Sequence, residues 1–280
     1  MSQKINNDFY ALAEKIETKS LFKNDSVILP NRSEYAIKVK TDEGEKIVNF
    51  CSKNYQLVKN NEIFPRIEDT LSRHFIFQKK YRHVNHSIFW ADYAIEGSDF
   101  TVGNSRDVVK PVIRILHSYD GSVSFRAKMG FYRQICSNGL WGYKYDTDIN
   151  LKHSIGNFDK IMNDTIKGLD DFIKNAKNYI GSFDELAKHR IPDPERYIEL
   201  LVNSTRFPSR QMQAVIERAY TEQQTHDLEM SKWLIYNAFN YQLNHNKDFT
   251  NDELYRMQID AQLLQLTLNG VEKENKLVLV

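Results

Sequence analysis

The clearest pattern of hydrophobic and polar positions lies in residues 113–141. Two apolar runs flank Asp120 and Gly121, a pair that two-residue type I′ turns favour because both central residues need a positive φ. The second run alternates, with Val123, Phe125, Ala127 and Met129 on one side and Ser122, Ser124, Arg126 and Lys128 on the other. The pattern predicts a β-hairpin whose second strand has one buried face and one cationic face.

Strand patterns come first in the chain and helical patterns later. Alternation predicts strands at 34–40, 45–51, 74–84, 86–96 and 112–119, the hairpin strand at 122–130, and a further strand at 140–150. A period of 3.6 residues predicts helices at 3–23, 61–74, 156–180, 193–204, 209–223, 229–243 and 250–268. This order is typical of an α+β fold, with an antiparallel β-sheet and flanking helices followed by a helical C-terminal part.

The best candidate junction between these two parts lies between Gly181 and Pro192. We therefore predict an α+β domain at 1–180 that ends in a long amphipathic helix, and a helical subdomain at 181–280 packed on it. One continuous domain is the alternative, because no low-complexity linker separates the parts. Asp193 and Thr250 are expected to cap the helices that follow them.

Composition narrows the class of protein. Hydrophobic residues make up 41% of the chain and aromatic residues 12%, which argues against disorder. No apolar run reaches the roughly 18–20 residues that span a bilayer, and the N-terminus lacks a signal-peptide core. We therefore expect a soluble, cytoplasmic protein with no membrane partner. Cys51 and Cys136 are the only cysteines, too few for a disulfide framework.

Charge is unevenly distributed although the net charge is only +1. Residues 1–180 contain 27 Lys and Arg against 22 Asp and Glu, and residues 181–280 contain 11 against 15. Within 101–145, seven cations are accompanied by only two acidic residues, Asp107 and Asp120. This excess indicates either a solvated sheet face or a basic surface for phosphates or for an acidic protein.

Catalytic and cofactor sites find little support in the sequence. The histidines of the sheet region lack metal-ligand spacing, and no glycine-rich phosphate loop occurs, so we expect neither metal nor cofactor. Cys136 beside Arg133 has the setting of an activated thiol, with His153 and either Asn138 or Asp148 as partners. The simpler interpretation is a buried cysteine followed by a turn at Ser137, Asn138 and Gly139. An enzyme with an unrecognised site therefore stays an alternative.

Cations on the predicted strands support nucleic-acid binding best. Phosphates require cations, and single strands also require aromatic faces for base stacking. We predict phosphate contacts from Arg126, Lys128, Arg133 and Lys79, with Arg114 in support. If Asp120 and Gly121 close a two-residue loop, Arg114 lies opposite Ala127 on the apolar face. A buried arginine there requires a carboxylate partner, because an unpaired buried charge is very costly.

Four blocks of sequence carry a family resemblance: residues 54–64, residues 118–121, residues 133–140 with 153–156, and residues 233–238 with His245. In this order they resemble the phage- and plasmid-encoded family of unknown function that occurs in prophages and mobile elements. The usual pattern has Asn-Ser-His-Asp-Gly where this chain has His117-Ser-Tyr-Asp-Gly121. The resemblance implies a mobile-element origin and carries no established activity.

The order of elements also resembles, at the level of fold, the single-strand annealing proteins of phage recombination. Our leading hypothesis is a phage or mobile-element protein of the bacterial cytoplasm that binds single-stranded nucleic acid, in annealing or recombination, without a cofactor. The alternative is a protein-binding module that inhibits or redirects a host factor such as a defence system, with the acidic helical part as its docking surface. Formation of a homo-oligomer is left open.

Overall fold

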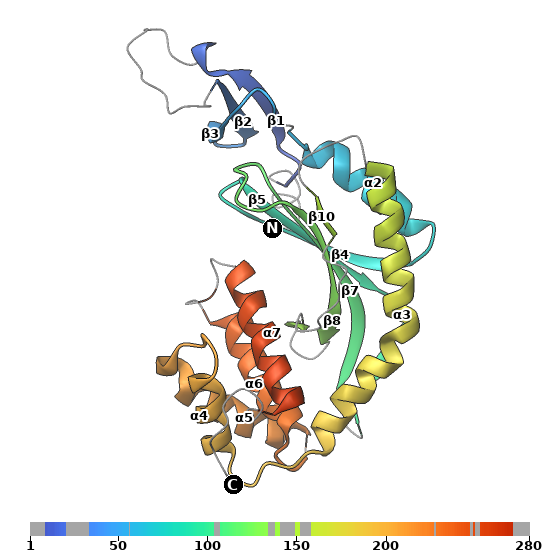
Figure 1. The fold of residues 1–280 in the computed structure, drawn as a ribbon, viewed down its shortest axis with the longest axis vertical. Helices are drawn as coiled ribbons and strands as arrows, with labels where there is room; N and C mark the ends of the chain where they lie inside the picture. The colour runs from blue at the N-terminus through green and yellow to red at the C-terminus, as the bar shows by residue number, and fades with distance from the viewer. Residues whose placement is uncertain are drawn as a thin grey trace. The chain divides into compact units, whose positions relative to one another are not determined.

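The computed structural model describes residues 9–20, 34–55, 57–103, 107–133, 138–140, 149–151, 158–226, 228–246, 249 and 253–270. Antiparallel sheets occupy the N-terminal half and helices the C-terminal half, which confirms the predicted α+β fold (Figure 1). No helix in this described part of the chain has the length and apolar character needed to cross a membrane.

The strands form two sheets. The small sheet has the order β1-β2-β3, with β1 (Leu12–Glu17), β2 (Tyr35–Thr41) and β3 (Gly44–Cys51). The large sheet has the order β10-β8-β7-β5-β4, with β6 paired to β7 and β9 paired to β8. Its strands are β4 (Phe77–Val84), β5 (Ile88–Ile95), β6 (Phe100–Thr101), β7 (Val108–Ser118), β8 (Phe125–Arg133), β9 (Asn138–Leu140) and β10 (Ile149–Leu151).

The helices confirm most of the 3.6-residue patterns. They are η1 (Thr18–Ser20), α2 (Asn60–Ser72), α3 (Phe158–Lys188), α4 (Pro194–Asn203), η3 (Ser209–Gln211), α5 (Met212–His226), α6 (Lys232–His245) and α7 (Glu253–Asn269). Asp193 caps α4 as predicted, because its side chain accepts a hydrogen bond from the Arg196 backbone N–H at 3.1 Å. The predicted cap at Thr250 lies outside the described residues.

The chain divides into two compact units. The first comprises residues 1–96, 113–128 and 146–170, and the second comprises residues 97–112, 129–145 and 171–280. The strands β7 and β8 and the helix α3 contribute residues to both. The predicted junction between Gly181 and Pro192 stays a prediction.

The predicted helix at 3–23 is wrong for the residues of this segment that are described. Leu12–Glu17 form β1 and pair with β2 from Leu12↔Lys40 to Glu17↔Tyr35. Ala13 is buried while Leu12 is 54% exposed, as strand alternation allows. The apolar spacing fits both periods, and a short isolated helix is marginal in water, so the backbone ladder to β2 decides the outcome.

The predicted two-residue turn at Asp120 and Gly121 is also wrong, although the two strands form. β7 ends at Ser118 and β8 begins at Phe125, so a longer loop connects them. Gly121 has φ +74°, but Asp120 does not have the positive φ that a type I′ turn requires. The Ser118 hydroxyl donates to the Val123 carbonyl and accepts from the Val123 N–H, both at 2.9 Å, and thereby closes the loop.

A tight turn joins β4 to β5, where the sequence predicted a reversal, and residues 85–87 lie between the paired residues Val84 and Ile88. Asn85 and His86 have φ values of 48° and 57°, and the Ser87 N–H donates to the Val84 carbonyl at 3.0 Å. Two successive positive φ angles are the signature of a type I′ turn, whose twist matches that of the flanking strands. This turn fixes which residues of β4 and β5 stand opposite one another.

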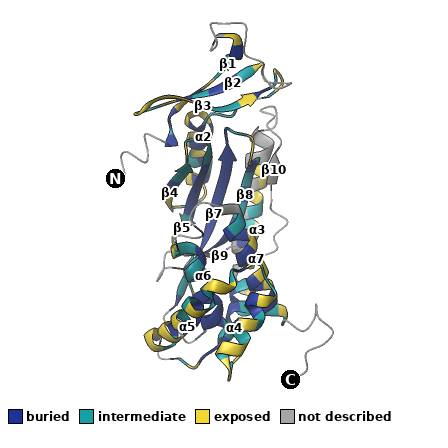
Figure 2. Ribbon diagram, turned by 90° about the vertical axis from the view of Figure 1, so that its left-hand side faces the viewer, coloured by how far each residue is buried: buried dark blue, intermediate teal, exposed yellow. Residues whose placement is uncertain are grey.

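The helix α2 covers one face of the large sheet in the first unit. Its buried positions include Ile63, Phe64 and Ile67, and the Phe64 ring lies 4.7 Å from that of Phe9. Buried residues continue along most of β7, the central strand (Figure 2). The sheet therefore has a helix-covered face and an opposite face.

Candidate nucleic-acid interface

Ring contacts identify which side chains of the large sheet lie on the helix-covered face. In the first unit, the His117 ring lies 6.5 Å from that of Phe89 and 6.2 Å from that of Phe125. Tyr93, four residues from Phe89 on β5, donates its hydroxyl to Glu68 of α2 at 3.3 Å. Because side chains alternate along each strand, the residues next to these in sequence lie on the opposite face.

An ion pair and the strand register show which side chains lie on the face of the large sheet that α2 does not cover. Arg114 donates from Nε to Asp92 Oδ1 at 2.5 Å and from Nη2 to Oδ2 at 2.7 Å, so these two side chains share a face. Across the β4–β5 ladder, Lys80 pairs with Asp92, and Arg82 pairs with Trp90. Directly opposed residues of a ladder point to the same side.

We call this surface the cation face. Its basic residues in the first unit are Lys80, Arg82, Arg114, Arg126 and Lys128. Among the described residues of β4, β5, β7 and β8 in this unit, Asp92 is the one acidic residue that alternation places with them. Among these described strand residues, the cations of the face therefore outnumber its acidic residues by five to one.

Exposure and electrostatics agree with this assignment. Lys80 is exposed, and Arg82, Arg126 and Lys128 are half-buried. Burial, followed by the positive charge of Arg82, lowers the pKa of Lys80, and Asp92 does not offset these effects. The lowered pKa of Lys80 therefore reflects its partial burial first and the nearby charge of Arg82 second.

Arg126 and Lys128 lie together on one face of β8 as the sequence predicted. Arg126 donates from Nε to Ser124 Oγ at 3.0 Å, which directs its side chain along this face. Arg114 lies on the same face but is only 3% exposed, so its guanidinium group supports the sheet through Asp92. The condition that a buried Arg114 needs a carboxylate partner is therefore met.

Lys79 does not belong to the cation face, which corrects its predicted grouping with Arg126. It stands opposite Tyr93 in the ladder, on the helix-covered face, and its Nζ lies 2.7 Å from Glu68 Oε2. Lys80 and Arg82 take its place. The sequence could have shown this, because side chains alternate along β4 from the turn at Asn85. Alternation places the even-numbered residues of β4, and not Lys79, on the cation face.

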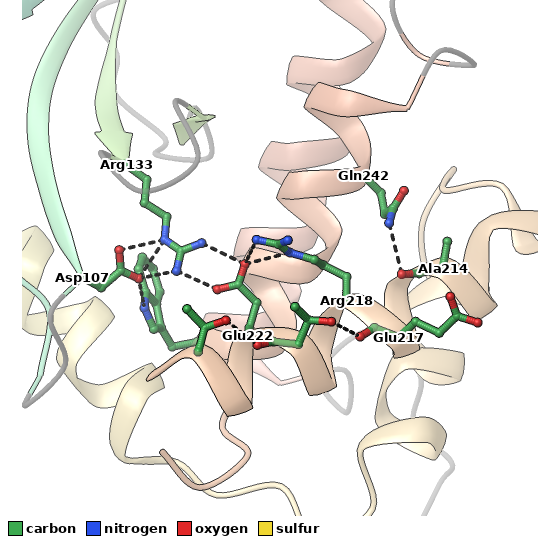
Figure 3. A network of polar contacts seen from close by, with 10 residues as sticks. Asp107, Arg133, Ala214, Glu217, Arg218, Glu222 and Gln242 are labelled. Atoms are coloured by element: carbon green, nitrogen blue, oxygen red, sulfur yellow. Dashed lines mark hydrogen bonds and ion pairs between the residues drawn. The ribbon is translucent and has the colours of Figure 1, made fainter. Parts of the chain in front are cut away.

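Arg133 is buried in the second unit, which removes it from any surface. Figure 3 shows its guanidinium group between Asp107 and Glu222. Nε donates to the Asp107 oxygens at 2.8 and 2.7 Å, and Nη2 donates to Glu222 Oε2 at 2.8 Å. Trp233 Nε1 also donates to Asp107, at 3.0 Å, and Arg218 Nη2 donates to Glu222 Oε1 at 2.6 Å. The predicted phosphate contact is replaced by a structural one.

The charges of this network balance. Burial alone would lower the pKa of Arg133, but the hydrogen bonds to Glu222 and Asp107 outweigh it and raise the pKa above its ordinary value. Burial alone would raise the pKa of Glu222, but Arg133 and Arg218 outweigh it and hold the pKa below its ordinary value. Arg133 and Glu222 therefore each favour their charged form in the interior.

The predicted turn at residues 137–139 is only partly within the described residues. Cys136 and Ser137 lie outside them. Asn138 and Gly139 belong to β9, where Asn138 pairs with Arg133 and Gly139 with Tyr132. Asn138 and Gly139 are therefore strand residues, and the predicted turn does not include them.

Tyr119 connects two of the sequence blocks. Its hydroxyl accepts a hydrogen bond from the Asn60 N–H at 2.8 Å, and its carbonyl accepts from Tyr55 at 3.2 Å and from Asn49 at 3.0 Å. His117 Nε2 lies 2.8 Å from the Val58 carbonyl oxygen. The blocks at 54–64 and 117–121 thus form one structural cluster in the first unit.

The histidines show one close pair, His83 and His86, whose rings stack at 4.6 Å. Among the described residues, no three His, Cys, Asp or Glu side chains are grouped so that they would hold a metal ion.

Comparisons with known proteins identify a family. The family model described as Domain of unknown function (DUF932) matches residues 48–265, which include β3 to most of α7. No curated protein and no solved structure matches the chain.

Proposed function

The chain belongs to the DUF932 family, a family of unknown function, and we propose that it binds single-stranded nucleic acid through the cation face. The observation that supports this most is the gathering of Lys80, Arg82, Arg126 and Lys128 on one face, where Asp92 is the one acidic residue among the described strand residues and is bonded by Arg114. The proposal includes an origin in a phage or other mobile element and a role in annealing or recombination, without a cofactor.

The geometry of the face favours an extended strand of nucleic acid as the ligand. Cations two residues apart on one strand, such as Arg126 and Lys128, are roughly 6.6 Å apart along the strand, and neighbouring strands are about 4.8 Å apart. The two pairs of cations lie on β4 and β8, which β5 and β7 separate, so a flexible single strand that crosses the sheet could meet one pair at each side. Binding of this kind is dominated by neutralisation of phosphates and does not require a sequence.

Direct binding tests the proposal. The full chain is titrated with a fluorescent single-stranded oligonucleotide of about 30 nucleotides at salt concentrations of about 50 mM and about 200 mM. We expect binding at the lower concentration and affinity at least about tenfold weaker at the higher one, because displaced counterions compete. Absence of binding at the lower concentration would contradict the proposal.

A protein-binding module that redirects a host factor is the second candidate, and the small sheet favours it. Leu12, Ile47 and Phe50 are 54%, 39% and 44% exposed. Register places them on one face of the small sheet, since Leu12 pairs with Lys40, Ile47 with Lys38 and Phe50 with Ala36. Exposed apolar groups on one face are typical of protein contacts.

The same surface provides the test of this second candidate. The full chain and the double variant Leu12→Ser/Phe50→Ser are compared as baits for bacterial host proteins. A defined host protein that binds the wild type and loses affinity for the variant would support the module. Equal binding to both would contradict a role for this face.

A further inference from the structure

Trp90 carries a buried donor that the fold leaves unused. The side chain is 4% exposed, and its indole Nε1 has no hydrogen-bond partner among the described residues. Buried tryptophans usually donate this N–H, as Trp233 does to Asp107 at 3.0 Å. Burying a donor without an acceptor lowers the stability of the folded state. A donor that is kept in such a position can serve to bind a ligand.

The surroundings of Trp90 point to a negatively charged acceptor. Arg82 stands directly opposite Trp90 in the β4–β5 ladder and makes no ion pair with any described residue. Asp92, two residues further along β5, has both oxygens engaged by Arg114. An indole N–H and a guanidinium group therefore share one face, and no carboxylate among the described residues bonds either of them.

We infer that Trp90 and Arg82 form an oxyanion subsite in the cation face, which takes one phosphate group of the bound nucleic acid. This inference rests on the proposed function. The indole N–H donates to one non-bridging phosphate oxygen, and the Arg82 guanidinium donates to the same phosphate. Planar guanidinium groups suit phosphate because two N–H groups reach two oxygens at once.

Access to the subsite requires a side chain to move. Trp90 is nearly covered, whereas Arg82 is half-buried and has a long, flexible stem. Long cationic side chains lie along apolar surface and can swing outward without disturbing the backbone. The arriving phosphate therefore attracts Arg82 and uncovers the indole edge in the same movement.

Two substitutions test the subsite. Trp90→Phe keeps an aromatic ring and removes the N–H, and Arg82→Gln removes the charge. We expect each to weaken single-strand binding about tenfold, the loss that follows removal of one hydrogen bond to a charged group. Arg73→Gln is the matched charge control, because Arg73 is exposed on the same unit and bonds only Asp69 among the described residues. It should bind like the wild type.

The unfolding temperature of Trp90→Phe distinguishes a role of Trp90 in ligand binding from a role in the stability of the fold. Because the Trp90 N–H bonds nothing in the described part of the chain, Trp90→Phe should unfold at nearly the wild-type temperature. Inorganic phosphate provides the second probe: it should change the intrinsic fluorescence of the wild type and have a smaller effect on Trp90→Phe. Wild-type affinity in Trp90→Phe, or a large loss of its stability, would overturn the subsite.

The outcomes distinguish this inference from the proposed function. If Trp90→Phe binds oligonucleotide normally while Arg126→Gln/Lys128→Gln binds weakly, the subsite is wrong and the nucleic-acid interface stands. If the wild type binds no oligonucleotide but phosphate changes only the fluorescence that depends on Trp90, the oxyanion subsite stands for free phosphate and the proposed function fails.

Discussion

Burial decides what each arginine does in this protein. Arg114 and Arg133 are enclosed and bonded through two nitrogens to carboxylates, whereas Arg126 lies on a half-buried strand face. The sequence derived the need of Arg114 for a carboxylate from a two-residue turn that does not form, and Arg114 lies on the face of Arg126 and not on that of Ala127. It is nevertheless buried, so the need is real, and Asp92 meets it. The partners of Arg133 were not predictable, because Glu222 lies 89 residues away on a helix whose packing no local pattern specifies.

Acid stability should depend on Glu222. Its pKa lies below the ordinary value of 4.5 in the folded state, because Arg133 and Arg218 outweigh the effect of burial. A lowered folded pKa contributes stability that is present above the unfolded pKa and lost as pH falls through the folded pKa. Thermal unfolding measured below about pH 5 should therefore decline less steeply in Glu222→Gln than in the wild type.

Glu217→Gln is the control for this experiment, since Glu217 lies on the same helix and is exposed. It should retain the wild-type decline. An equally steep decline in Glu222→Gln would show that the network does not contribute to acid unfolding.

Two buried asparagines of α6 should respond oppositely to the same substitution. Asn237 is fully buried, and neither its Oδ1 nor its Nδ2 has a partner among the described residues, whereas Asn240 Nδ2 donates to Asp260 Oδ1 at 2.9 Å. Replacing an unsatisfied polar group by an apolar one of similar volume removes a penalty of about 1 kcal/mol. Urea unfolding should show that Asn237→Leu is more stable than the wild type and Asn240→Leu less stable. A less stable Asn237→Leu would contradict this reading.

At the scale of elements, long or strongly alternating patterns were reliable and short ones were not. The 3.6-residue period of α3 and the alternation of β8 both predicted what forms, because each specifies one face over many residues. The prediction of a helix at β1 was wrong because the few apolar positions of this segment fit both the helical period and the strand period. The turn types also differed: Asn85 and His86 take the two positive φ angles that Asp120 and Gly121 were expected to take.

Two glycines should show opposite effects of an added methyl group. Gly121 has φ +74°, so Gly121→Ala strains the β7–β8 loop and should destabilise the protein by about 1 kcal/mol. Gly181 lies inside α3, where a Cβ would meet nothing within 4 Å, so Gly181→Ala should stabilise it by about 0.5–1 kcal/mol. Denaturant unfolding checks both signs. A stabilising Gly121→Ala would contradict the backbone assignment of this loop.

At the scale of the whole molecule, net charge says little and the distribution of charge says more. The chain carries a formal charge of only +1, yet one face of the first unit gathers four cations besides the Arg114–Asp92 pair. Composition indicated the excess of cations, but not which residues share the face. Lys79 and Lys80 are neighbours in sequence, and only the register set by the Asn85 turn separates them.

The salt dependence of oligonucleotide binding tests the central claim most directly. The full chain is compared with Arg126→Gln/Lys128→Gln on the cation face and with Lys46→Gln/Lys59→Gln, which removes the same charge from an exposed and a half-buried position elsewhere in the first unit. Loss of two phosphate contacts should reduce the slope of log affinity against log salt by about 1.4, because each contact to a single strand contributes about 0.7. The control should keep the wild-type slope. Equal slopes in all three proteins would contradict binding through the cation face.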